Sequence, residues 1–154
     1  MAEDDLVERL LGIEAGSPLA ALRLQREAIR RHAQGAWREL VLTEAPGGVS
    51  PQERAAVALA VARQQGDVAL VAECEALAAQ AGAPAEGART EALLRYAAMV
   101  AEAPGRCGQV DIDTLTAAGM SPQDIVAVTQ LVAFIPFQVR LLAGLRAMQE
   151  EARA

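Results

Sequence analysis

Apolar residues recur along this chain at the three- and four-residue spacing of amphipathic helices, and capping residues, glycines and prolines separate the apolar stretches. No strand-like alternation and no glycine-rich nucleotide-binding loop interrupts the pattern. The second predicted helix should loosen around Gly35, and the last should bend at Pro136. The pattern predicts one all-α domain over 1–154, with helices over about 6–11, 17–42, 50–65, 67–82 and 86–103, a short helix begun by Asp111 or Asp113 and ended by Gly119, and a last helix from 121 onward.

Short polar segments predict where several of these helices begin. Ser50-Pro51-Gln52-Glu53 has the form of a capping box, in which the serine oxygen and the glutamate each accept a backbone N–H from the other residue. Asp67 can cap the helix that follows Gly66, Ser17 precedes a proline at a first helical position, and Asp4 or Asp5 can cap the first helix. The same Ser-Pro-Gln-acid start recurs at 121–124, so 50–65 and 121–136 are either two well-made helix starts or the heads of two comparable helical units.

Composition and charge narrow the class of protein. Apolar residues make up 53% and aromatic residues 3%, which favours closely packed helices over a sheet. The fourteen basic residues are all arginines, so Schiff-base chemistry on a lysine is excluded. The net charge of −6 argues against a nucleic-acid partner and an anionic membrane surface. The acidic start is unlike a signal peptide, and no uninterrupted apolar run approaches the ~18 residues of a membrane span, so we expect a cytoplasmic protein.

The mean hydropathy of +0.18 is high for a charged chain of this size. Excess apolar surface is most simply buried between subunits, so we expect a homo-oligomer.

The segment SPQERAAVALAVARQQGDVALVAEC at 50–74 resembles the core motif of the alkylhydroperoxidase D / carboxymuconolactone decarboxylase superfamily. The closing segment, with Phe134, Gln138 and Arg140, is similar to the last helix of that family, and 1–45 resembles the helical N-terminal extension of members that lack a CxxC motif. The resemblance implies an alkylhydroperoxidase D-like helical bundle of about six to eight helices and a homo-oligomer.

The resemblance also shows which family residues are missing. In the family, the second helix of the motif opens with Cys-x-x-Cys and carries a histidine four residues later, and a glutamate lies twelve residues before the first cysteine. These positions fall on Asp67, Leu70, Cys74 and Ala55. The scaffold is therefore expected without its dithiol chemistry.

The two cysteines lie 33 positions apart, which is too far for a CxxC site. Cys74 follows a run of apolar residues and is flanked by Glu73 and Glu75, so its pKa should be raised; it is either an inert core residue or a weak catalytic candidate. Cys107 lies in a predicted exposed loop beside Arg106, either as an incidental surface thiol or as a functional one. The sequence is compatible both with a disulfide between Cys74 and Cys107 and with two free thiols.

The remaining candidates are polar residues on predicted helices. His32, the only histidine, is either structural or a polar group in a pocket with Tyr96, Gln138 and Arg140. Arg140, among apolar neighbours, needs either a carboxylate such as Glu53 or an anionic ligand. One histidine cannot form a histidine-based metal cluster, and we expect neither a metal nor a cofactor.

Two functional classes follow. One is an alkylhydroperoxidase D-like protein that has lost dithiol peroxidase activity and acts as a small-molecule-binding or structural oligomer. The other is an enzyme, either a divergent peroxidase-related antioxidant protein using Cys74 or Cys107 or a cofactor-free decarboxylase or lactone-handling enzyme. The missing cysteine pair favours the first class.

Overall fold

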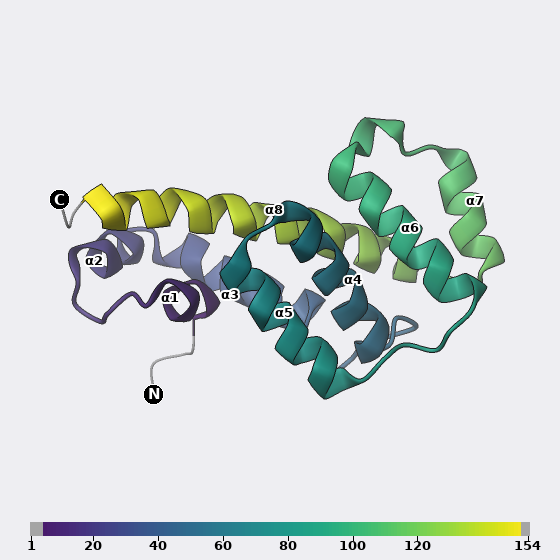
Figure 1. The fold of residues 1–154 in the computed structure, drawn as a ribbon, viewed down its shortest axis with the longest axis horizontal. Coiled ribbons are helices and arrows are strands. Elements are labelled where there is room, and N and C mark those ends of the chain that lie inside the picture. The colour runs from purple at the N-terminus through teal and green to yellow at the C-terminus, as the bar shows by residue number, and fades with distance from the viewer. Residues whose placement is uncertain (1–4, 152–154) are drawn as a thin grey trace.

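The computed structural model describes residues 5–151, and this part of the chain forms eight α-helices, one short 3-10 helix and no strand (Figure 1). The all-α prediction is thereby confirmed. The helices are α1 (Leu6–Leu11), α2 (Pro18–Leu24), α3 (Glu27–Leu40), α4 (Pro51–Gln65), α5 (Val68–Ala81), α6 (Ala88–Glu102), η1 (Pro104–Arg106), α7 (Gln109–Ala117) and α8 (Pro122–Glu151).

Most helices begin where the sequence places a capping residue. Asp5 and Ser17 each accept a backbone N–H three residues on, while Asp4 lies outside the described residues. The capping box at Ser50 is complete, because the Ser50 Oγ accepts the Glu53 N–H at 3.2 Å and the Glu53 Oε2 accepts the Ser50 N–H at 2.8 Å. Asp67 caps α5. These caps satisfy N–H groups that have no partner inside their own helix.

Three expectations about the helices were wrong. The predicted helix over 17–42 is two helices that meet at Gln25 and Arg26, and Gly35 lies inside α3 without a break. Arg26 leaves the helical conformation there, with φ −121° and ψ 43°. The helix α7 begins at Gln109, because Asp111 is its third residue and accepts the Gly108 N–H at 2.9 Å instead of capping the helix itself.

The core lies around α4, which packs against α5, α6 and α8. Its buried side chains are mainly alanine, valine and leucine, so the helix axes can approach closely. Figure 1 shows α8 running along the long axis of the molecule, with α2 beside its C-terminal part and α6 and α7 at its other end. The two ends of α8 therefore lie beside different helices.

The long helix α8 also changes one expectation from the sequence. It is long and apolar enough, by length and composition, to cross a membrane, although half of its most apolar window is buried against other helices. A core helix of a soluble protein meets the same criterion. Pro136 lies inside α8 and the helix continues through it, so the bend expected there remains a prediction.

The two Ser-Pro-Gln-acid segments are brought together by Arg89 of α6. The Arg89 Nε contacts the Glu53 Oε1 at 2.6 Å, and its two Nη groups donate to the carbonyls of Gly48 and Gly119 at 2.6 and 3.1 Å. The Gly48 N–H donates to the Asp124 Oδ1 at 3.0 Å. One arginine thus links the starts of α4, α6 and α8.

Candidate functional site

The N-terminus of α5 is where the resemblance to the superfamily places its first cysteine, and this chain has Asp67 there. One carboxylate oxygen accepts the Leu70 N–H at 3.0 Å. The other accepts two hydrogen bonds from the Arg146 guanidinium, both at 3.1 Å. A carboxylate that caps a helix and pairs with an arginine cannot attack a peroxide. This position therefore has a structural role in α5 and in its attachment to α8.

The next two motif positions, Leu70 and Cys74, are both completely buried. Burial raises the pKa of the Cys74 thiol to about 12, and the negative charge of Glu73 adds to the increase. At pH 7 only on the order of 10⁻⁵ of such a thiol is ionised. The structure places Cys74 in the hydrophobic core, and its position more than one turn from Asp67 removes any help from the helix dipole.

Ala55, where the resemblance places a glutamate, is buried on α4 and borders a cavity of about 270 Å³. Apolar side chains, Thr43 and Gln80 line this cavity, and none of its described lining residues titrates near neutral pH. The cavity can hold a small molecule, but it offers no general acid or base from these residues.

Cys107 differs from its sequence-based description. It is half-buried and packs against the core, because the short helix η1 turns the chain back toward α6. Its side chain lies near the Tyr96 hydroxyl, which is 2.6 Å from the Thr129 Oγ1. Burial raises the pKa of Tyr96, the bond to Thr129 lowers it, and the neighbouring Cys107 raises it further. Both cysteines are free, so the disulfide left open by the sequence does not form in this structure.

The four remaining candidates do not form one site. Tyr96 contacts α8 at Thr129, nine residues before Gln138, and nine residues of helix span about 14 Å. Gln138 is buried, with 1% of its surface exposed, and its Oε1 has no hydrogen-bond partner among the described residues. His32 and Arg140 are exposed. Glu53, suggested as a partner for Arg140, pairs with Arg89 instead because α6 places that arginine against the capping box.

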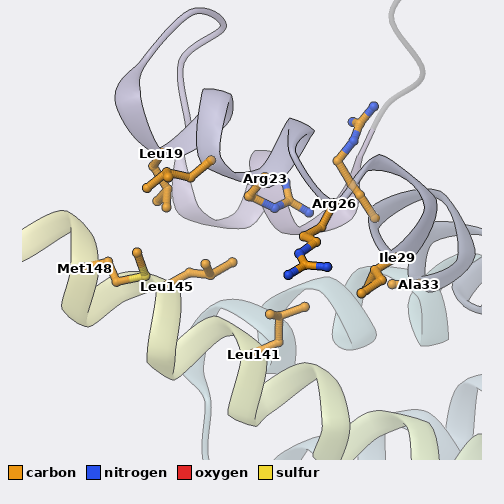
Figure 2. A pocket seen from close by; sticks show the side chains of 10 residues that line it. Leu19, Arg23, Arg26, Ile29, Ala33, Leu141, Leu145 and Met148 are labelled. Carbon is orange, nitrogen blue, oxygen red and sulfur yellow. The ribbon is translucent and has the colours of Figure 1, made fainter.

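A second cavity, of about 300 Å³, lies between α2, α3 and the C-terminal half of α8 (Figure 2). Figure 2 shows Leu141, Leu145 and Met148 of α8 on one side, with Leu19 and Ile29 across from them. The apolar wall is completed by Leu22 and Ala33. This is a concave and largely apolar site of the kind that binds small molecules.

Three arginines form the polar part of this cavity: Arg23, Arg26 and Arg30. Arg23 pairs with Asp5 at 3.1 Å and with Glu8 at 2.7 Å. The sequence analysis did not single out any of these arginines. Their clustering within one eight-residue segment is the signal that could have revealed them, although Arg23 lies in α2, Arg26 at the break and Arg30 in α3.

Comparisons with known proteins bear on the fold. The chain matches the crystal structure of an "alkylhydroperoxidase AhpD core", described as an uncharacterized peroxidase-related protein from Ralstonia eutropha JMP134, with a TM-score of 0.60 over 92% of this chain and 83% of that one. The two sequences are 21% identical. This chain has the alkylhydroperoxidase D-like fold. No protein-family model and no curated protein matches the sequence.

The alkylhydroperoxidase D-like fold is thus present with an altered set of residues at the motif positions. Asp67 stabilises a helix, Leu70 and Cys74 pack in the core, and Ala55 supplies no carboxylate. Among residues 5–151, no group of three or more histidine, cysteine or acidic side chains is arranged to hold a metal ion. The apolar cavity with its arginines is the feature that most resembles a binding site.

Proposed function

We propose that this protein is an alkylhydroperoxidase D-like protein that has lost thiol peroxidase activity and acts by non-covalent binding of a small molecule. The observation that carries the proposal is the state of Cys74, which is fully buried with a pKa of about 12. It is the one cysteine that falls on any of the motif positions.

Thiol peroxidases need an ionised cysteine. The thiolate sulfur attacks the peroxide O–O bond, becomes a sulfenic acid and releases an alcohol or water, and a second thiol then reduces the sulfenic acid. At the N-terminus of α5, where the helix dipole would favour a thiolate, the chain has the Asp67–Arg146 ion pair. The chemistry therefore lacks both its nucleophile and its second thiol at these positions.

The binding part of the proposal is supported by the cavity between α2, α3 and α8. Its volume of about 300 Å³ lies at the lower end of the range for small-molecule sites. Its walls are apolar, and its charged side chains have one sign.

A divergent peroxidase-related antioxidant enzyme is the second candidate, and the observation that favours it is the position of Cys107. This thiol is partly accessible and lies beside the Tyr96 hydroxyl, which could exchange a proton with it. Cys74 does not pair with it in this structure, so the reduced state would have to be restored by an external thiol.

Peroxide consumption with dithiothreitol as reductant separates the two candidates. The proposal expects the wild type, Cys74→Ser and Cys107→Ser to consume hydrogen peroxide and cumene hydroperoxide at the same background rate. Catalytic turnover that disappears in Cys107→Ser but not in Cys74→Ser would establish the antioxidant enzyme instead. Turnover that disappears in Cys74→Ser would contradict the assignment of Cys74 to the core.

A further inference from the structure

The cavity between α2, α3 and α8 combines two properties that are seldom found together by chance. Its walls include Leu22, Ile29 and Met148, which are large apolar side chains with about half or more of their surface exposed. Its charged lining residues are the three arginines Arg23, Arg26 and Arg30. Exposed apolar surface in a concave site is typical of a place where another molecule binds.

Among the described residues, only Asp5 and Glu8 form ion pairs with the arginines of the cavity. Arg23 forms close ion pairs with Asp5 and Glu8. Arg30 reaches the same two carboxylates only at 3.7 and 3.5 Å, and its Nε is buried without a hydrogen-bond partner among the described residues. The structure records no ion pair for Arg26 with any residue of 5–151. All the charged side chains that line the cavity are therefore positive, in a chain whose net charge is −6.

We propose that this cavity binds an amphiphilic monoanion, a carboxylate with an apolar tail, as the ligand of the small-molecule function proposed above. The carboxylate accepts hydrogen bonds from the guanidinium of Arg26, and the tail lies against Leu141, Leu145 and Met148. Arginine suits this role because its planar guanidinium can donate two parallel hydrogen bonds to one carboxylate.

The size of the cavity limits the tail. A cavity of about 150 Å³ accommodates benzene, so one of about twice that volume accommodates on the order of a dozen non-hydrogen atoms. A carboxylate with an unbranched chain of about ten carbons, such as decanoate, has this size. Longer chains would extend into solvent past Met148 and Leu22 at the open side.

A second copy of this chain is the competing occupant, because the same exposed apolar residues could pack against another subunit. The charged lining residues favour the anion, because all of them are arginines and the net charge of a second copy is −6. The two occupants also predict different responses to a charge placed at the rim.

Isothermal titration calorimetry of the full chain with sodium decanoate tests the proposal, with 1-decanol and decyltrimethylammonium bromide as neutral and cationic probes. We expect one decanoate per chain, weaker binding of decanol and no binding of the cation. Arg26→Gln should weaken decanoate binding about tenfold to a hundredfold and leave decanol unaffected. Arg95→Gln, which removes an exposed arginine of α6 away from the cavity lining, is the matched control and should leave decanoate binding unchanged.

Ile29→Glu provides a second test at a side chain that is 62% exposed, so the fold should tolerate it. The new carboxylate would repel the carboxylate of decanoate beside the arginines, so it should abolish decanoate binding without changing the mass measured by light scattering. Equal decanoate affinity in the wild type and Arg26→Gln, or no saturable binding at all, would overturn the proposal. A dimer that Ile29→Glu dissociates, without decanoate binding, would assign the cavity to a second copy. These outcomes do not depend on peroxide turnover, which tests the loss of peroxidase activity separately.

Discussion

Replacing Arg54 of α4 with methionine should destabilise the protein more than the same change at Arg63, the other arginine of this helix. Arg54 is only 5% exposed, and its guanidinium donates to three backbone carbonyls: Val49 at 3.1 Å, Leu40 at 2.9 Å and Pro46 at 2.8 Å. These bonds attach the loop before α4 to the end of α3. Burial lowers the pKa of Arg54, but an arginine stays charged at any pH where the fold exists.

The magnitude follows from these contacts. A hydrogen bond from a charged donor contributes about 1.5–3 kcal/mol. The three bonds of Arg54 would give several kcal/mol in total, against which the cost of burying a guanidinium, also several kcal/mol, must be set. Methionine keeps most of the apolar stem but leaves three carbonyls without a donor, so we expect a loss of about 3 kcal/mol in the free energy of unfolding.

Urea unfolding followed by far-UV circular dichroism measures this loss as a lower midpoint with an unchanged slope. Arg63→Met is the matched control on the same helix, because Arg63 is exposed and forms a single ion pair with the exposed Glu75, worth about 0–1 kcal/mol. Arg54→Lys should lie in between, since an ammonium cannot reach three carbonyls in the planar arrangement of a guanidinium. If Arg54→Met and Arg63→Met differ by less than about 0.5 kcal/mol, the role assigned to Arg54 is wrong.

Three further predictions concern acid, thiols and assembly. Burial raises the pKa of Glu53, but its hydrogen bonds with Arg89 and Ser50 and the charge of Arg89 outweigh burial and lower it overall. The stability contributed by Glu53 is therefore present above its unfolded-state pKa of about 4.3 and is lost as the pH falls through the folded-state value. In Glu53→Gln, the free energy of unfolding measured by urea titration should depend less on pH in the acid range. With a thiol reagent, the native protein should show one slowly reacting group that is absent in Cys107→Ser, while Cys74 should react only after unfolding; rapid labelling of native Cys107→Ser would contradict this. Light scattering should give a mass above the 16.1 kDa of one chain, because side chains such as Val68, 83% exposed, leave apolar surface uncovered; a monomer would argue against a homo-oligomer.

The sequence predicted the helix starts well because those interactions are local. Ser50 and Glu53, or Asp67 and Leu70, lie three residues apart, so the chain itself places donor and acceptor together once the helix begins. The break at Arg26 gave no such signal, since neither glycine nor proline marks it. There the local sequence is compatible with a continuous helix, and packing of α2 and α3 against α8 decides the outcome.

The candidate site was predicted less completely. The loss of the dithiol could be inferred from Asp67 and Leu70, and the high pKa of Cys74 from its apolar neighbours. The cavity could not, because it is formed by α8 and by helices more than a hundred residues earlier in the chain. The partner of Arg89 was also unpredictable, since Glu53 lies 36 residues away and several other acids could have paired with it.

Arg89 and its contacts have a consequence for how the protein folds. The Gly48–Asp124 hydrogen bond joins residues 76 positions apart, and the Arg89–Gly48 bond joins residues 41 positions apart. Closing such long loops costs entropy that only the completed packing repays, so these bonds should form late on the folding route and open early on the unfolding route. The first turns of α4 and α8, although far apart in sequence, should therefore gain protection from amide exchange in the same kinetic step. Arg89 should thus couple a late step of folding in α4, α6 and α8.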